Sequence, residues 1–260
     1  MTESALVVRS LCKNYGGFAV TRNVDLELPR GARHALIGPN GAGKTTLVGL
    51  ISGAIAANSG TIELFGRDIT TISAAQRVKQ GLVRTFQVNS LFPHLSVFQN
   101  IFLACSEARG ISQRMLGRTS GQKPIIGQVE AILELLGLSA DAGRPVATIA
   151  YGRQRLVELG IALALEPRVL LLDEPAAGVP SVEVPLLIHA IDRLGEDITI
   201  LLIEHDMQIV QRFARTMTVL AEGQVIASGA PDVVMASEQV RSVYLGKSGH
   251  QRFESGKAHA

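Results

Sequence analysis

One short stretch decides how this chain folds: Gly38-Pro39-Asn40-Gly41-Ala42-Gly43-Lys44-Thr45. It fits the pattern G-x-x-x-x-G-K-[S/T] at every fixed position. Glycines let backbone N–H groups turn inward around anionic oxygens, and a helix that begins at Lys44 adds the positive end of its dipole. An apolar run at 35–38 precedes the loop, and apolar residues at helical spacing follow it. This strand–loop–helix context predicts a phosphate-binding loop in an α/β fold.

The loop also assigns chemistry to its last residues. Lys44 can reach the β- and γ-phosphates of ATP, and the hydroxyl of Thr45 can ligate Mg²⁺. Thr46 is expected to make a further phosphate contact. The four fixed positions should match by chance in about one or two chains of this length in a hundred, from average residue usage. We therefore expect residues 38–46 to bind ATP.

A second signal is the apolar run at 169–172, which stops at Asp173 and Glu174. Unbroken apolar strands are typical of parallel sheets buried on both faces. Carboxylates at the carboxyl end of such a strand lie where ligands bind in open α/β sheets. Asp173 is expected to hold Mg²⁺ through water, and Glu174 to polarise an attacking water as general base. Taken alone, a strand end with solvated acids is an equal alternative, but a neighbouring phosphate loop favours catalysis.

Composition bounds the function classes. The 260 residues, 47% hydrophobic and 18% charged, allow a sizeable core in one large α/β domain or two small ones. A net charge of +2 with scattered Lys and Arg gives no reason to expect a nucleic-acid partner. Cys12 and Cys105 lack metal-ligand spacing. With no signal peptide in 1–10 and no run near the ~18 apolar residues of a membrane span, we expect a cytoplasmic protein that needs a partner for any membrane role.

The order of expected elements outlines the domain. Strands at 6–11, 25–28 and 60–64 can form a small antiparallel sheet. A core plus β subdomain is expected over 1–87 and 166–246. Its remaining elements are strands at 81–86, 169–172 and 199–203, a helix at 182–194 and a hairpin at 216–221 and 224–228. Residues 88–165 show helical spacing and predict an inserted helical subdomain, with 106–127 as a loop or loosely ordered insert. The tail at 247–260 is expected to be flexible.

Further motifs point to a family. They are Arg84-Thr85-Phe86-Gln87, Leu91-Phe92-Pro93-His94-Leu95, Tyr151-Gly152-Arg153-Gln154-Arg155, Ala176-Ala177-Gly178, Ile203-Glu204-His205-Asp206 and Tyr244-Leu245-Gly246. With the two motifs above, they span nearly the whole chain. The sequence resembles the ATP-binding subunits of ABC transporters, and most closely those of branched-chain amino acid importers. The resemblance implies a P-loop NTPase fold: a RecA-like, mostly parallel core with an antiparallel β subdomain and an inserted helical subdomain.

The resemblance also implies roles for single residues. Tyr15 would stack on adenine, with Val20 nearby; the alternative is an aromatic with a packing role. Gln87 would touch Mg²⁺ or the attacking water. His205 would contact the γ-phosphate and position the water; the alternative is a core histidine at a strand end.

Residues 150–154 (Ala150, Tyr151, Gly152, Arg153, Gln154) occupy the signature motif, which starts a helix. In the family two domains pair head to tail, and each signature helix points its N-terminus at ATP held by the partner. The family usually has Ser where Ala150 stands, and tends to Leu-Asn-Pro or Leu-Asp where Val179-Pro180-Ser181 stand. Both departures put in doubt the composite site that this chain completes in its partner. We hypothesise an asymmetric pair.

The implied function is to bind and hydrolyse ATP for an importer of branched-chain amino acids or of related amides, urea or aromatic acids. The implied partners are two polytopic permease subunits, contacted near 87–100; a second ABC ATPase, identical or distinct; and, indirectly, a periplasmic solute-binding protein. The location would be peripheral, on the inner face of the plasma membrane. One alternative is an ABC-type ATPase of a soluble assembly or a DNA-repair complex. Another is a regulatory module without hydrolysis, which an intact Glu174 and His205 oppose.

Overall fold

The protein is described by a computed structural model over residues 3–85, 91–110 and 123–245. These residues form two compact units, one from residues up to 71 together with those from 201 onward, the other from 72–200. Gln87, most of the expected insert at 106–127 and the tail at 247–260 lie outside the described residues. The proposed limits of the helical subdomain, 88–165, stay a prediction.

The first unit contains the expected antiparallel sheet. Its strands are β1 (Ser4–Tyr15), β2 (Phe18–Pro29), β4 (Ser59–Leu64) and β5 (Arg67–Asp68), in the order β2-β1-β4-β5. All three pairings are antiparallel. Buried Val24, Leu26 and Leu28 alternate with exposed residues along β2, as expected for a sheet covered on one face.

A second set of strands in this unit carries the phosphate loop. Strands β3 (Arg33–Ile37), β9 (Thr216–Ala221) and β10 (Gln224–Gly229) follow the order β10-β9-β3-β8, where β8 (Thr199–Ile203) contains the boundary between the units. β3 and β9 are parallel, while β9 and β10 form the expected hairpin through Glu222 and Gly223. Every residue of β3 is buried, which fixes the strand that leads into the loop.

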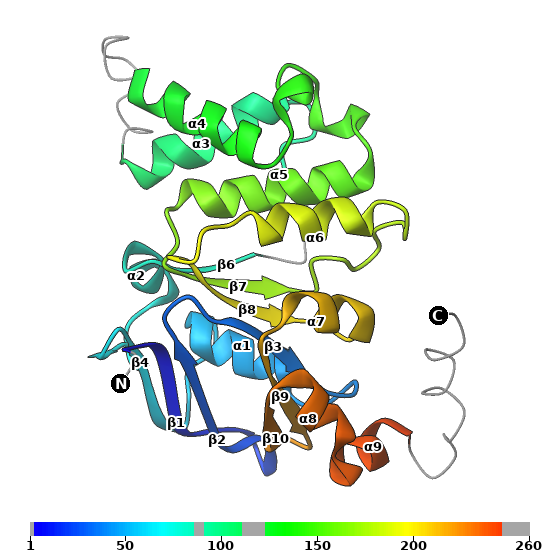
Figure 1. Ribbon diagram of the computed structural model, residues 1–260. Helices are drawn as coiled ribbons and strands as arrows, with labels where there is room; N and C mark the ends of the chain where they lie inside the picture. Colours follow the sequence, from blue (N-terminus) through cyan, green and yellow to red (C-terminus); the bar gives the residue numbers. More distant parts are fainter. Residues whose placement is uncertain (1–2, 86–90, 111–122, 246–260) are drawn as a thin grey trace. The chain divides into compact units, whose positions relative to one another are not determined.

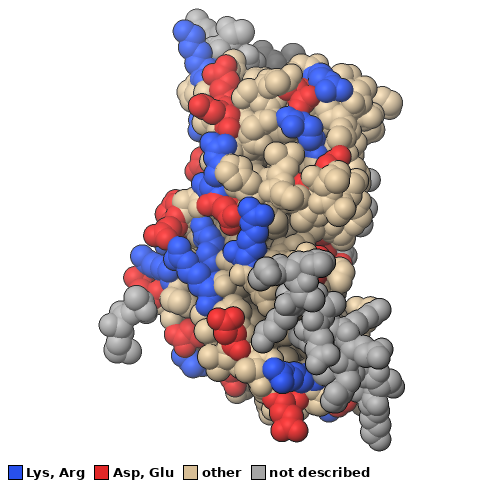
Figure 2. Space-filling view, turned by 45° about the vertical axis from the view of Figure 1, so that its right-hand side comes forward, with Lys and Arg blue, Asp and Glu red and all other residues tan. Residues whose placement is uncertain are grey.

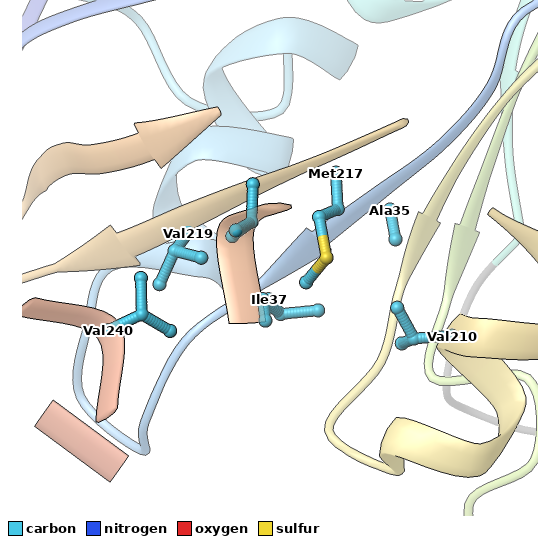
Figure 3. Packing of buried hydrophobic residues seen from close by; sticks show 7 residues of the cluster. Ala35, Ile37, Val210, Met217, Val219 and Val240 are labelled. Atoms are coloured by element: carbon cyan, nitrogen blue, oxygen red, sulfur yellow. The ribbon is translucent and has the colours of Figure 1, made fainter. Parts of the chain in front are cut away.

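Three helices of this unit contribute to an apolar cluster on these strands. They are α7 (Met207–Phe213), α8 (Pro231–Ala236) and α9 (Glu238–Leu245), while α1 (Lys44–Ser52) follows the phosphate loop. The cluster joins side chains from strands and helices: Ala35, Ile37, Val210, Met217, Val219, Val234 and Val240. Figure 3 shows Met217 of β9 extending toward Ile37 of β3. The C-terminal helices are thereby held against the strand that precedes the phosphate loop.

The second unit combines a parallel strand pair with helices. It contains α2 (Ala74–Lys79), β6 (Leu82–Arg84), α3 (Val97–Ala108), α4 (Lys123–Leu135), α5 (Tyr151–Ala164), β7 (Val169–Asp173) and α6 (Val184–Asp192). β6 and β7 pair in parallel. Helices α3, α4 and α5 lie side by side (Figure 1), and a Cβ on Gly160 of α5 would come within 3.0 Å of Ile101 of α3.

The expectation of a loop at 106–127 is wrong at both ends. Helix α3 continues to Ala108, and α4 begins at Lys123. Within α3 the hydroxyl of Ser106 donates to the carbonyl of Phe102, at 2.8 Å, one turn earlier, so its polar group has a partner inside the helix. Pro124 is accommodated because it lies in the first turn of α4, where its missing N–H has no intrahelical role.

Among the described residues there is no long apolar helix, and the face shown in Figure 2 is not uniformly charged. Within the described ranges, no helix is long and apolar enough to cross a membrane. On the face shown in Figure 2, Lys and Arg side chains lie interspersed with Asp and Glu.

Candidate functional site

The phosphate loop owes its shape to two close backbone approaches. Gly38 follows β3, and a Cβ there would lie 2.2 Å from the carbonyl oxygen of Leu220 in β9. Gly43 has φ 98°, and a Cβ there would lie 2.8 Å from the carbonyl oxygen of Val20 in β2. Because both obstacles are backbone atoms of strands, they cannot move aside. Glycine is therefore required at both positions by the strands that flank the loop.

Lys44 lies across the loop. Its Nζ donates to the carbonyl oxygen of Gly38 at 2.7 Å and to that of Pro39 at 3.1 Å, and the side chain is buried. Thr45 is exposed and Thr46 is half-buried on the first turn of α1. The helix has no side-chain cap at Gly43, and Leu47 N–H donates to Gly43 O. An ammonium group and helix N-terminal amides thus meet at one loop, which suits an anion.

Tyr15 ends β1 at the turn of the β1–β2 hairpin. The residue is 52% exposed, so it is not buried in the core, and its role stays a prediction. Lys13 Nζ lies 5.2 Å from the centre of its ring. Val20 is half-buried on β2, and its carbonyl faces Gly43 of the phosphate loop. An exposed aromatic residue thus lies in the same unit as the phosphate loop.

His205 follows the end of β8. Its side chain is 62% exposed, so it is not a core histidine. The preceding Glu204 is buried, and its Oε2 accepts from the His205 backbone N–H at 3.2 Å and lies 3.9 Å from Nδ1. Asp206 then caps α7 by accepting from Gln208 N–H at 2.8 Å. The buried carboxylate and the cap fix the backbone on both sides of an exposed imidazole.

In the second unit, Asp173 closes β7. It is buried, and its Oδ2 accepts from Nη2 of Arg84 on β6 at 2.5 Å. Its N–H donates to Oγ1 of Thr85 at 3.4 Å. Sequence reasoning quoted Arg84 and Thr85 only as part of a motif and missed this contact. The parallel pairing of β6 with β7 is what brings the residues together.

Glu174 has an unusual backbone. Its φ is +46°, a left-handed conformation that costs a non-glycine residue about 1–2 kcal/mol. Its carbonyl accepts from Ala177 N–H at 3.0 Å, which starts the turn that follows β7. Strained backbone of this kind clusters at functional sites, and here it belongs to a half-buried carboxylate at the end of a strand.

The signature residues begin α5, as expected. Ala150 is the exposed N-cap and provides no side-chain cap. Arg155 donates to the Tyr151 hydroxyl at 2.6 Å, while Arg153 Nε donates to Asp141 Oδ2 at 2.5 Å. The Gly152 N–H donates to Oε2 of Glu183 at 2.6 Å. Glu183 is a contact that sequence reasoning missed, since the residues are 31 positions apart.

The sequence also matches a known family. The sequence pattern of the ABC transporter family matches residues 21–177, more than half of the chain. The chain belongs to the ABC transporter family. A further description, of branched-chain amino acid ATP-binding cassette transporters, matches residues 224–250 of this ABC protein, from β10 onward.

Relatives of this ABC protein align along almost their whole length. The high-affinity branched-chain amino acid transport ATP-binding protein LivG of Escherichia coli is 34% identical over 255 residues, 95% of this chain and 100% of the relative. The corresponding BraF of Pseudomonas aeruginosa is 32% identical, with the same coverage. A solved nucleotide-free ATP-binding cassette from an ABC transporter is 28% identical with a TM-score of 0.81, over 94% of this chain and 99% of that one. This match confirms the predicted P-loop NTPase fold.

The site residues of the ABC protein fall into groups. Lys44, Thr45, Tyr15 and His205 belong to the first unit, and Asp173, Glu174 and the signature belong to the second. Gln87 lies outside the described residues, so its role stays a prediction. Among the described residues, no group of three or more His, Cys, Asp or Glu could hold a metal ion by itself. A cation bound by any of these side chains would need oxygens from nucleotide and water as further ligands.

Burial shifts the pKa of several side chains. It lowers the pKa of His34, on β3, to about 4, and raises the pKa of Tyr244, on α9, to about 12. In the second unit, burial raises the pKa of Glu158, on α5, while the hydrogen bond and charge of Arg155 oppose the change. The strand before the loop therefore contains a histidine that stays neutral at neutral pH.

Proposed function

We propose that this chain binds and hydrolyses ATP to energise an importer of branched-chain amino acids or of a related solute. The observation that carries the proposal is the complete phosphate loop, in which two glycines are required and Lys44 lies across the loop. Named relatives that match from end to end, and the matched segment at 224–250, favour branched-chain amino acids over other solutes.

ATP would bind with its phosphates in the loop. Backbone N–H groups of 38–46 and the α1 dipole would hold the oxygens, and Lys44 would exchange its carbonyl partners for the β- and γ-phosphates. Tyr15 would stack on adenine beside Val20. Since Tyr15 is exposed, this stacking would not disturb the core.

Mg²⁺ would be held by the exposed hydroxyl of Thr45 and by Asp173, with Gln87 as a further ligand or a water contact. Asp173 is already paired with Arg84, which suits a contact through water. When bound, the ion neutralises charge on the β- and γ-phosphates. Among the residues that the structure describes, the donors are hydroxyl and carboxylate oxygens, which suit this cation.

Hydrolysis would use Glu174 as the general base. Glu174 has a left-handed backbone directly after β7, which would orient its carboxylate at the end of the strand. His205, exposed beyond β8, would contact the γ-phosphate and position the water. Proton removal by a positioned base contributes about 10²–10⁴-fold to a rate.

The assembly would pair this chain with a second ABC ATPase, identical or distinct. The signature residues 150–154 would face the partner's ATP, and two permease subunits would dock near 87–100, where Phe92 is 57% exposed. A periplasmic solute-binding protein would act through the permeases. The chain would then lie on the inner face of the plasma membrane.

Two experiments test the proposal. Lys44→Ala should abolish binding of a fluorescent ATP analogue and phosphate release, whereas Lys79→Ala, at an exposed position of α2, should change neither. Affinity purification from detergent-solubilised membranes should recover polytopic permeases. ATP hydrolysis without any membrane partner would instead favour a soluble assembly, and binding without phosphate release would favour a regulatory module.

A further inference from the structure

The N-terminus of α5 already holds an anion from its own chain. This helix of 14 residues has Ala150 at its N-cap, which offers no oxygen to the first-turn amides. The Gly152 N–H instead donates to Glu183 Oε2 at 2.6 Å. A carboxylate at this end of a helix is stabilised both by the hydrogen bond and by the dipole.

The contact is built into the sequence at both ends. A Cβ on residue 152 would lie 2.4 Å from Oε2 and 2.9 Å from the Cβ of Glu183, so only glycine admits the carboxylate. The backbone of Glu183 is fixed in turn, since its N–H donates to Pro180 O at 2.8 Å. Its own carbonyl accepts from Leu186 N–H at 3.1 Å and so begins α6. One residue therefore starts α6 with its backbone and caps α5 with its side chain.

The two arginines in the first turns of α5 contact other groups of the chain. Arg153 contacts Asp141 and the carbonyl of Gly137, at 2.5 and 2.8 Å. Arg155 contacts Glu158 at 2.6 Å. An anion at the N-terminus of α5 would therefore be held by the first-turn amides and by the helix dipole.

We infer that Glu183 is an internal anion that competes with a nucleotide phosphate for the N-terminus of α5. This inference rests on the proposed function, in which the signature helix receives the γ-phosphate of the partner's ATP. Two anions cannot share one N–H donor and one dipole end without repulsion. Glu183 must turn away before the partner's ATP can be bound from this side, so it sets how tightly the composite site closes.

The first test needs no nucleotide. Hydrogen exchange of the Gly152 amide should be at least about tenfold faster in Glu183→Ala than in the wild-type chain. Glu183→Gln keeps the size and an acceptor oxygen, so this variant guards against misfolding and should exchange at an intermediate rate. Glu130→Gln makes the same chemical change at an exposed position of α4 and should leave the exchange unchanged. Equal exchange in the wild type and Glu183→Ala would overturn the inference.

The second test measures binding of Mg-ATP to the assembled complex with the Glu174→Gln substitution, which blocks turnover. Glu183→Gln should tighten the apparent ATP affinity by about two- to fivefold, the range expected for removing one charge at a helix terminus. Glu130→Gln should leave the affinity unchanged. Unchanged affinity in Glu183→Gln would also overturn the inference. If ATP fails to bind even without substitution at 183, the proposed function itself is wrong, and the exchange of Gly152 still reports on the carboxylate.

Discussion

Acid should weaken the strand that leads into the phosphate loop, because His34 is buried there as a neutral ring. Its side chain is only 3% exposed. Nδ1 lies 2.8 Å from Oγ1 of Thr216, and Nε2 lies 2.9 Å from Oγ1 of Thr218. Burial lowers its pKa from 6.5 to about 4. The unfolded chain therefore takes up a proton at a higher pH than the folded chain does.

The sign and size follow from these two pKa values. Stability from the neutral ring is present above pH 6.5 and is lost as the pH falls toward about 4. The two pKa values differ by about 2.5, and a difference of one in pKa corresponds to about 1.4 kcal/mol. The free energy of unfolding should therefore fall by about 3 kcal/mol over this pH range. Below about pH 4 both states are protonated and no further loss arises from this group.

The assay is urea unfolding at several pH values between 7.5 and 4. His34→Gln removes the titration, so the difference in unfolding free energy between wild type and variant should shrink by about 3 kcal/mol across this range. Glu158, whose pKa is raised by burial, changes stability in the opposite direction but cancels in the difference. His189→Gln, at an exposed position of α6, should leave the pH dependence unchanged. A difference independent of pH would refute the reasoning.

Three further substitutions test the site. Gly38→Ala places a methyl group against Leu220 O, so it should lower the free energy of unfolding by about 1–3 kcal/mol and abolish ATP binding. Gly66→Ala, where nothing lies within 4 Å, should lower the free energy of unfolding by about 1 kcal/mol. Calorimetry measures both variants, and equal losses of stability would argue against the close approach at Gly38. Ala150→Ser should add about 1 kcal/mol of helix capping and raise phosphate release by the complex; no gain in rate or affinity would count against a role for the hydroxyl. Tyr15→Ala should weaken ATP binding about tenfold while changing stability by less than about 0.5 kcal/mol, and titration calorimetry that shows unchanged affinity would exclude stacking.

Local patterns made part of this structure predictable. The phosphate loop, its helix and the β9–β10 hairpin all follow from neighbouring residues, such as the Glu222-Gly223 turn. The buried strands β7 and β8 follow from continuous apolar runs. The boundary between the two units, which lies inside β8, could not be predicted, because the apolar residues of that strand do not change in kind across it.

Contacts between distant residues were not predictable. Arg84 and Asp173 are 89 positions apart and meet only because β6 pairs with β7. Glu183 reaches Gly152 only because α5 and α6 begin side by side. No residue type or spacing reports such pairs, whereas a one-turn bond such as that of Ser106 in α3 lies within reach of local rules.

The most direct test of the proposed chemistry is phosphate release by Glu174→Gln, measured together with ATP binding. The substitution keeps the size of the side chain and removes the base. We predict that ATP still binds and that the rate of hydrolysis falls by at least about 10²-fold. Turnover at the wild-type rate would contradict the assignment of the base and, with it, the account of how this chain uses ATP.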